Sequence, residues 1–285
     1  RKVYNQLLEW KRDWDGKYAC LLEGARRVGK TTIAEEFARN EYDSYILIDF
    51  SNVSKEMIDI FDDISKLDRF FLRLQVETGI ELYERKSVII FDEIQLFPKA
   101  RQAIKHLVKD GRYDYIETGS LISIKKNVKD ILIPSEEHRI RVYPMDYEEF
   151  CWALGDTSTF PLLEQAFARR KSLGDDVNRY LMRKFRLYML IGGMPQAINE
   201  YIATQNLQSV DNVKRRILKL YADDLHKIDP TDKLRAIFWA IPSELHKNTT
   251  RYQITTVIEN VKADKRNELL EALRESMIAN IAYHS

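Results

Sequence analysis

The sequence predicts an α/β fold in which a parallel sheet is covered by helices on both faces and is followed by an all-helical region. Over the first half of the chain, short apolar runs typical of buried strands alternate with segments whose apolar residues recur at helical spacing. Beyond about Tyr143, only the helical spacing continues. Strands that alternate with helices favour a parallel sheet, because each crossover helix packs on one of its faces.

The apolar pattern places the expected elements in order. Buried strands are expected at residues 18–22, 44–50, 87–91, 113–118 and 140–143. The helices around them are expected at 2–13, from Thr32 to Ala38, at 54–64, at 67–78, from Pro98 to about Val108, and at 145–154, 160–172, 176–190, 195–205 and 209–226. Proline suits the first turn of a helix, because its missing N–H would have no partner there.

These elements divide the chain into three domains. The expected domains are residues 1–144, an α/β domain, residues 145–228, a helical lid, and residues 229–285, a C-terminal region. The C-terminal region holds helical patterns near 232–245 and 264–277, and an apolar run at Ile278–Tyr283 that would suit a strand. A winged-helix fragment fits this pattern, and the absence of a clear end signal indicates a truncated region.

The composition is that of a soluble globular protein. The 285 residues are 31% charged and 45% apolar, and Lys and Arg outnumber Asp and Glu by 45 to 44. A net charge of +1 gives no overall basic field, so nucleic acid could be bound only through a local patch. No apolar run approaches the roughly 18 residues that cross a bilayer. Cys20 and Cys151 offer no disulfide framework, which fits a reducing, cytoplasmic setting.

Residues 24–32 fit the pattern G-x-x-x-x-G-K-[ST] of a phosphate-binding loop. A buried strand precedes them and a helix follows, an arrangement that aims backbone N–H groups and a helix N-terminus at one anion. The residues expected to bind a nucleotide here are Gly24, Ala25, Arg26, Arg27, Val28, Gly29, Lys30, Thr31 and Thr32. Lys30 is expected to reach the β- and γ-phosphates of ATP, and the Thr31 hydroxyl to ligate Mg²⁺.

A second signal is the acidic pair Asp92-Glu93, which follows the apolar run Val88–Phe91. In an open parallel sheet, ligands bind at the carboxyl ends of the strands. Asp92 is therefore expected to hold Mg²⁺ through water, and Glu93 to polarise the water that attacks the γ-phosphate. The alternative is a solvated acidic pair at the end of a strand.

These two segments resemble the AAA+ ATPases, together with Glu117–Ser120, Tyr143–Phe150 and Gly192–Pro195. The likeness is to the prokaryotic AAA-type ATPases that usually carry a nuclease-like C-terminal domain of unknown function, and it extends over about residues 1–226. It implies a three-layered AAA+ type P-loop domain followed by an all-α lid. The usual C-terminal domain is not recognisable, so the resemblance implies no nuclease-related activity.

The same resemblance assigns roles to polar residues after the fourth and fifth strands. It implies that Thr118 or Ser120 contacts the γ-phosphate or the attacking water, with the choice between them open, and the alternative is a hydroxyl cap on the next helix. It also implies that Arg139 or Arg141 acts as a finger on a neighbouring subunit's γ-phosphate, where it neutralises charge in the transition state. A finger would require a homo-oligomer, and the alternative is a surface ion pair.

Pro195 opens a lid helix after two glycines, as its fixed φ allows. The segment is similar to the Gly-x-Pro element of the signal-transduction ATPases related to AAA+. In those proteins the proline packs on the adenine side of the nucleotide and couples the lid to the nucleotide state. The alternative is an ordinary turn between two helices.

Together these residues predict binding and hydrolysis of ATP with Mg²⁺, coupled to movement of the lid. A carboxylate at Glu93 favours attack by water, because P-loop kinases pass the phosphate to another substrate and need no acid there. The alternative function is a slow nucleotide-gated switch that controls a protein or DNA partner through the lid or the C-terminal region. A basic cluster at Lys214–Lys219 lies on a lid helix, although charge runs on helices are usually solvated. No membrane partner is expected.

Overall fold

The computed structural model describes residues 1–14, 16–120, 136–247 and 251–282. The chain divides into two compact units. The helical unit comprises Arg1–Lys2 and Tyr143–Asp223, and the sheet unit comprises Val3–Val142 and Asp224–Ser285. The division into two units does not test the three domains expected from the sequence, and their boundaries at residues 144 and 228 stay predictions.

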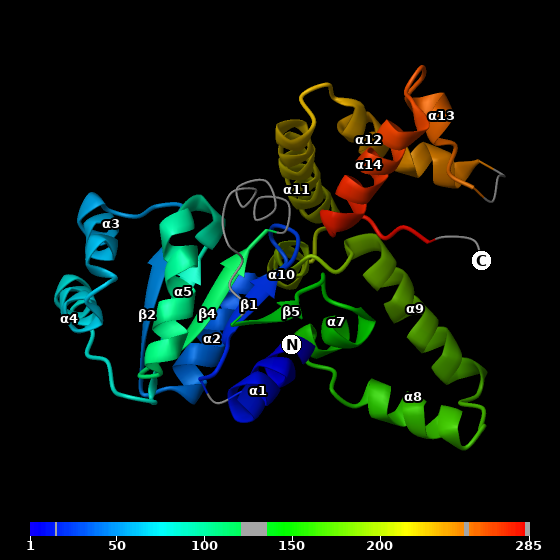
Figure 1. Cartoon of the computed structure of the whole chain (residues 1–285). Coiled ribbons are helices and arrows are strands. Elements are labelled where there is room, and N and C mark those ends of the chain that lie inside the picture. The colour runs from blue at the N-terminus through cyan, green and yellow to red at the C-terminus, as the bar shows by residue number, and fades with distance from the viewer. Residues whose placement is uncertain (15, 121–135, 248–250, 283–285) are drawn as a thin grey trace. The chain divides into compact units, whose positions relative to one another are not determined.

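The sheet has five strands that all run parallel, which confirms the expected fold class (Figure 1). The strands are β1 Ala19–Glu23, β2 Ser44–Asp49, β3 Ser87–Asp92, β4 Asp114–Gly119 and β5 Glu137–Arg141. Their order in space is β2-β3-β4-β1-β5. The carboxyl end of β4 therefore lies between the carboxyl ends of β1 and β3, the two strands that lead into the phosphate-binding loop and the acidic pair.

The fifth strand was expected at residues 140–143 but spans Glu137–Arg141. It is an edge strand that pairs with β1, and Ile140 is its one fully buried residue, so it does not form an apolar run. The charged residues at its start gave no apolar signal in the sequence.

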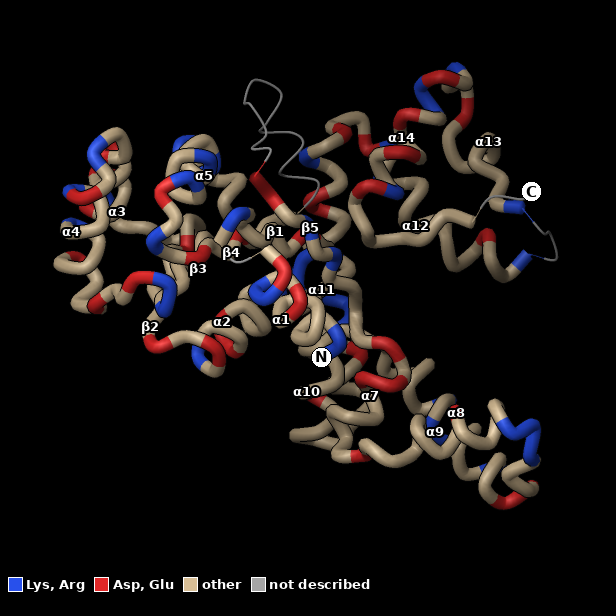
Figure 2. Tube along the Cα trace, turned by 60° about the horizontal axis from the view of Figure 1, so that its bottom comes forward, with Lys and Arg blue, Asp and Glu red and all other residues tan. Residues whose placement is uncertain are grey.

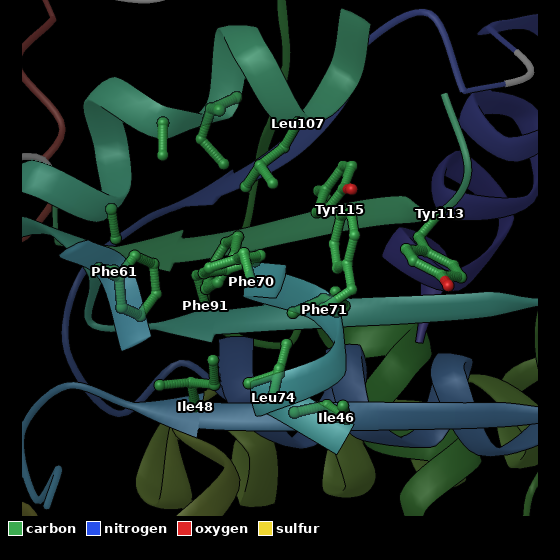
Figure 3. Close-up of a cluster of buried hydrophobic side chains, with 14 of the residues drawn as sticks. Ile46, Ile48, Phe61, Phe70, Phe71, Leu74, Phe91, Leu107, Tyr113 and Tyr115 are labelled. Carbon is green, nitrogen blue, oxygen red and sulfur yellow. The ribbon is translucent and has the colours of Figure 1, made fainter. Parts of the chain in front are cut away.

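Helices cover both faces of the sheet. They are α1 Lys2–Trp14, α2 Lys30–Glu41, α3 Lys55–Ile60, α4 Leu67–Thr78 and α5 Pro98–Asp110. Buried residues of α3, α4 and α5 form one apolar cluster with strand residues such as Ile48, Phe91 and Tyr115, so these helices share a face of the sheet (Figure 3). Helices α1 and α2 pack together, with Trp10 beside Phe37, and α2 lies against β2, β3 and β4 on the other face.

The helix expected at residues 54–64 is divided in two. Helix α3 begins after Ser54, whose Oγ accepts a hydrogen bond from the backbone N–H of Met57 at 3.1 Å. After Ile60 the chain tightens into a short 3₁₀ turn at Phe61–Asp63. The Phe61 ring is thereby directed into the apolar cluster, where it packs edge-on against Phe70.

The region after the sheet is helical, as expected. Its helices are α7 Tyr147–Ala153, α8 Thr159–Ala168, α9 Asp175–Ile191, α10 Pro195–Thr204 and α11 Leu207–Ile228. Buried residues of α7, α9, α10 and α11 form a separate core around Phe150 and Ile198. Helix α7 begins at Tyr147 because Asp146 and Glu149 form a capping box, in which each side chain accepts a hydrogen bond from the other residue's backbone N–H.

The C-terminal region consists of helices α12 Lys233–His246, α13 Ile254–Val257 and α14 Ala263–Glu275. The strand expected at Ile278–Tyr283 is wrong over residues 278–282, which form turn and irregular structure, while Tyr283 lies outside the described residues. An isolated apolar segment has no strand partner for its backbone N–H and C=O groups. Because the described part of residues 229–285 has no strands, it does not form the wing of a winged helix.

Charged residues of both signs are interleaved along the helices (Figure 2). Several of them pair along one helix face, such as Arg215 with Asp211 at 2.6 Å. This pattern agrees with the small net charge of +1. Among the described helices, none is long and apolar enough to cross a lipid bilayer.

One cluster of charged residues lies inside the sheet unit. Arg101 of α5 and Glu137 of β5 have side chains that are each 1% exposed, and Arg101 Nη2 lies 2.8 Å from Glu137 Oε1. Glu117 of β4 is also fully buried, and neither of its carboxylate oxygens has a hydrogen-bond partner among the described residues. Burial raises the pKa of Glu117 well above its ordinary value, and the charge of Glu137 raises it further. Glu117 therefore keeps its proton to higher pH than an exposed glutamate does.

This burial predicts a pH dependence of stability. The folded protein binds the Glu117 proton more tightly than the unfolded chain, so this residue's contribution to the free energy of unfolding falls as pH rises above the ordinary value of 4.5. Glu117→Gln removes that titration. Urea denaturation is expected to show the variant gaining stability relative to the wild type as the pH rises from about 5 towards the folded-state pKa of Glu117, by about 1.4 kcal/mol for each unit of pKa difference.

The exposed residue Glu9 provides the control. Glu9→Gln is expected to follow the wild-type pH profile. A Glu117→Gln profile that ran parallel to the wild type across this pH range would contradict the prediction.

Candidate nucleotide-binding site

The loop between β1 and α2 has the backbone conformation of an anion-binding turn. Arg27 has φ 66° and Gly29 has φ 90°, both in the left-handed region. Helix α2 begins at Lys30, two residues earlier than the Thr32 expected from the sequence, because the left-handed Gly29 serves as its N-cap. The N–H groups of the first turn of α2 therefore lie directly at the loop, where they can bind an anion.

Position 24 requires a glycine because the chain that follows β5 passes close to it. A Cβ added at Gly24 would lie 2.2 Å from the carbonyl oxygen of Val142. The Val142 N–H in turn donates to the carbonyl of Glu23 at 2.8 Å, which holds the two segments together. A side chain at position 24 would force the loop away from β5.

The Lys30 side chain curls back into the loop. Its Nζ donates to the carbonyl oxygens of Gly24 at 3.1 Å and Ala25 at 2.9 Å. Burial lowers the pKa of Lys30, while the charges of Glu93 and Asp92 act in the opposite direction. The ammonium group is thus at the loop and close to two acids, and a phosphate could offer it stronger, charge-assisted hydrogen bonds than the carbonyls do.

The carboxylate of Asp92 joins three elements. Thr31 Oγ1 of α2 donates to Asp92 Oδ1 at 2.7 Å, and Thr118 Oγ1 of β4 donates to the same oxygen. Side chains alternate along a strand, so Asp92 and Thr118 point to the opposite face from their neighbours Phe91 and Glu117, the face that α2 covers. The topology therefore brings the expected metal ligands together at one edge of the sheet.

These oxygens suit a magnesium ion bound with a nucleotide. A hydroxyl and a carboxylate are hard oxygen donors, and they are adjacent at the loop. Magnesium in nucleotide sites takes one or two protein oxygens and completes its octahedron with phosphate oxygens and water. The donor set at Thr31 and Asp92 fits this requirement.

Glu93 lies just beyond the end of β3 in a left-handed conformation, with φ 52° and ψ 43°. Its backbone N–H donates to Thr118 Oγ1 at 3.2 Å. Its carboxylate accepts a hydrogen bond from the side-chain amide of Gln95. The turn takes Glu93 out of the strand alternation and leaves its side chain partly exposed at the edge of the sheet where the loop lies.

The remaining expected residues of the sheet unit are distributed around this edge. Ser120 is buried directly after β4. On β5, Arg139 Nη2 lies 3.7 Å from Glu137, and Arg141 Nε lies 3.1 Å from Glu23, with the two arginine side chains 47% and 65% exposed. Each arginine therefore has an ion-pair partner on its own sheet and is accessible to solvent, and the finger role stays a prediction.

The other loop residues have different environments. Ala25 and Val28 are buried, whereas Arg27 and, on α2, Thr32 are exposed. Arg26 Nη1 lies 3.4 Å from Asp224 of α11, a contact across 198 residues that the sequence did not predict.

Pro195 begins α10 in the helical unit, as expected. The turn before it is closely packed, because a Cβ added at Gly193 would lie 2.1 Å from the carbonyl oxygen of Met145. The Met145 N–H also donates to the carbonyl of Gly193 at 2.7 Å. Pro195 and the phosphate-binding loop belong to different units, so its role beside the adenine stays a prediction.

Sequence reasoning assigned no role to Gln95, whose amide reaches Glu93. The sequence did contain a local indication, because Gln95 follows the expected base Glu93 by two residues and so lies in the same turn. The buried charges of Arg101, Glu117 and Glu137 were also missed. Their association depends on helix and strand packing that no local pattern encodes.

A parallel sheet with a phosphate-binding loop after β1, an acid at the end of β3 and a helical region defines a P-loop fold with a helical lid. Residues 16–151 match the family model of an AAA domain. This match agrees with the resemblance of this part of the chain to the AAA+ ATPases. Residues 182–284 match the family model of a domain of unknown function (DUF8612).

Two similar proteins give further comparisons. The uncharacterized protein MJ1637 of Methanocaldococcus jannaschii is 25% identical over 197 residues, which cover 65% of this chain and 40% of the relative. The match thus spans about two fifths of the relative's length. The structure of AMPPCP-bound DnaA from Aquifex aeolicus aligns with a TM-score of 0.43 and 11% sequence identity, over 96% of this chain and 86% of that chain.

The close approach at Gly24 predicts the effect of one added methyl group. Gly24→Ala is expected to displace the loop, because the new Cβ cannot share space with the Val142 carbonyl at 2.2 Å. Isothermal titration calorimetry is expected to show at least a tenfold loss of ADP affinity.

The matched control is Gly79→Ala, because Gly79 has φ 66° but no atom within 4 Å of an added Cβ. This variant is expected to lose about 1 kcal/mol of stability from backbone strain and to retain ADP affinity. Wild-type ADP binding by Gly24→Ala would contradict the proposed role of the close approach.

Proposed function

We propose that the chain binds ATP with Mg²⁺ and hydrolyses it to ADP and phosphate, and that the nucleotide state controls the position of the helical lid. The observation that carries this proposal is the hydrogen bond from Thr31 Oγ1 to Asp92 Oδ1 at 2.7 Å, beside the Lys30 ammonium in the loop. Residues 61 positions apart in the sequence, predicted independently from two motifs, lie in contact at one edge of the sheet.

The loop residues would hold the triphosphate. Lys30 would exchange the carbonyls of Gly24 and Ala25 for phosphate oxygens, and the N–H groups at the start of α2 would bind the same anion. Thr31 and Asp92 would hold the magnesium ion. When bound, this ion neutralises charge on the phosphate oxygens.

Glu93 would act as the general base. A water molecule that donates to its carboxylate becomes a better nucleophile for in-line attack on the γ-phosphate. Thr118, and Ser120 after it, would orient the γ-phosphate or that water, and Thr118 is the better placed because its hydroxyl already contacts both Asp92 and the Glu93 backbone. Arg139 or Arg141 would serve as a finger if a second copy binds against β5.

Helix α11 supports a connection between nucleotide and lid. It runs unbroken over Leu207–Ile228, from the helical unit into the sheet unit, where Asp224 contacts Arg26 of the loop. Phosphate in the loop would compete with Asp224 for the Arg26 guanidinium. Hydrolysis would then change the contacts of this helix. Pro195, packed on the adenine side of the nucleotide, would couple the lid to the nucleotide state.

The second candidate is a slow switch that holds a protein or DNA partner in one nucleotide state. It is favoured by α9, whose residues are mostly exposed and include apolar side chains such as Tyr180 and Met189 and cations such as Arg179 and Arg183. Single-turnover hydrolysis of ATP, measured with and without duplex DNA, distinguishes the candidate functions. Many-fold stimulation supports a DNA-dependent enzyme, and no response to nucleic acid supports a switch for a protein partner.

Lys30→Ala is expected to abolish ATP binding at concentrations near the wild-type Kd, because it removes the ammonium group that lies at the Gly24 and Ala25 carbonyls, where the phosphates are proposed to bind. Fluorescence titration with a labelled ATP analogue measures this directly. Lys86→Ala, which removes an exposed lysine on the sheet unit, is the control and is expected to bind normally. Equal affinities of the two variants would contradict the assignment of the loop.

Glu93→Gln is expected to bind ATP with wild-type affinity and to hydrolyse it 10²–10⁴-fold more slowly, the usual contribution of a general base. Phosphate release in the presence of Mg²⁺ measures the rate, and calorimetry measures the affinity. Glu35→Gln on α2 is the matched control and is expected to keep the wild-type rate. Unchanged turnover by Glu93→Gln would remove the base role.

A further inference from the structure

We propose that Gln95 is a positioning residue that orients the Glu93 carboxylate for its role as general base. This inference rests on the function proposed above. Gln95 Nε2 donates a hydrogen bond to Glu93 Oε2, and Gln95 is only 3% exposed. Most side-chain hydrogen bonds in proteins go to the backbone or to water. Here the donor is directed to a carboxylate that is partly exposed at the candidate site.

The turn that carries both residues is anchored to the core. Ile94 is fully buried in the apolar cluster of the α5 face, and the backbone N–H of Leu96 donates to the Glu93 carbonyl at 2.9 Å. Phe97 closes the turn through an N–H bond to Ile94 and stacks on Phe50 with ring centroids 5.2 Å apart. Gln95 is thus held between two anchored residues and has little freedom to move away from Glu93.

The backbone of Glu93 is fixed as well. Its left-handed conformation, with φ 52°, is uncommon for a residue with a side chain and costs free energy that the surroundings must supply. The bond from its N–H to Thr118 Oγ1, which itself donates to Asp92, ties this conformation to the expected metal ligand. Strained residues that are held in this way are concentrated at functional sites.

With the backbone fixed, the Glu93 carboxylate can still move through its side-chain torsions, and the hydrogen bond from Gln95 restricts them. Because Oε2 accepts from the amide, Oε1 is the oxygen that we assign to accept from the attacking water. A base that is itself oriented by a neighbouring group is a recurring arrangement in enzymes. A misplacement of about 1 Å in such a group costs up to a hundredfold in rate.

The test is Gln95→Met, which keeps the length and packing of the side chain and removes the donor. Steady-state phosphate release is expected to show kcat reduced about tenfold, with KM for ATP and the calorimetric Kd within twofold of the wild type. Gln75→Met is the matched control, because Gln75 of α4 also bonds through its amide, to the backbone of Phe71 and Leu82. That variant is expected to lower stability and to leave kcat unchanged.

A double-mutant cycle distinguishes positioning from a general loss of structure. If Gln95 acts through Glu93, then adding Gln95→Met to Glu93→Gln produces no further loss of rate, because the group it orients is already gone. A further tenfold loss in the double variant, or a kcat for Gln95→Met equal to or above that of the wild type, would overturn the proposal. Failure of the wild type itself to release phosphate would instead overturn the proposed function.

Discussion

The hydroxyls of Thr31 and Thr118 donate to one oxygen of Asp92, and this shared acceptor sets the relative positions of helix α2 and strands β3 and β4. A buried carboxylate is costly unless hydrogen bonds satisfy it, and Asp92 is only 7% exposed. Because β4 lies beside β3, the hydroxyl at its end reaches both Asp92 and the backbone N–H of Glu93. The hydrogen bonds that satisfy the buried Asp92 therefore also bring together the oxygen atoms that are expected to bind magnesium.

The loop is restrained from the opposite side by the chain that leaves β5. The Val142 carbonyl occupies the space where a Cβ of Gly24 would be, and the Val142 N–H extends the pairing with β1. The phosphate-binding loop therefore lies between an edge strand and the hydroxyls of the inner strands. A movement of β5 would therefore displace the loop through this contact, without any change in the residues that are expected to bind phosphate.

The sequence was sufficient for those parts of the fold whose signal is local. The inner strands β1, β3 and β4 are buried along their whole length and the edge strand β2 still carries an apolar run, so each gives a local signal. The phosphate-binding loop has a fixed spacing of glycines and lysine. Strand β5 was misplaced because this edge strand has one fully buried residue and forms no apolar run, and the C-terminal strand was wrong because an apolar run alone does not specify a pairing partner. The Gln95–Glu93 bond depends on the left-handed turn at Glu93, for which the sequence offered only a two-residue spacing. The buried Arg101–Glu137 pair depends on packing between distant segments, which spacing in the sequence does not encode.

The buried pair has a consequence for the strand it holds. Glu137, Arg139 and Arg141 occur at every second position of β5, so a slip of two residues along β1 would keep the alternation of faces and replace one charged residue by the next. Arg101 accepts only a carboxylate beside it in the apolar interior, and a slipped strand would bring Arg139 to that place and set two cations together. The ion pair thus fixes the register of β5 against β1. The register in turn determines where along the edge of the sheet the guanidinium groups of Arg139 and Arg141 lie.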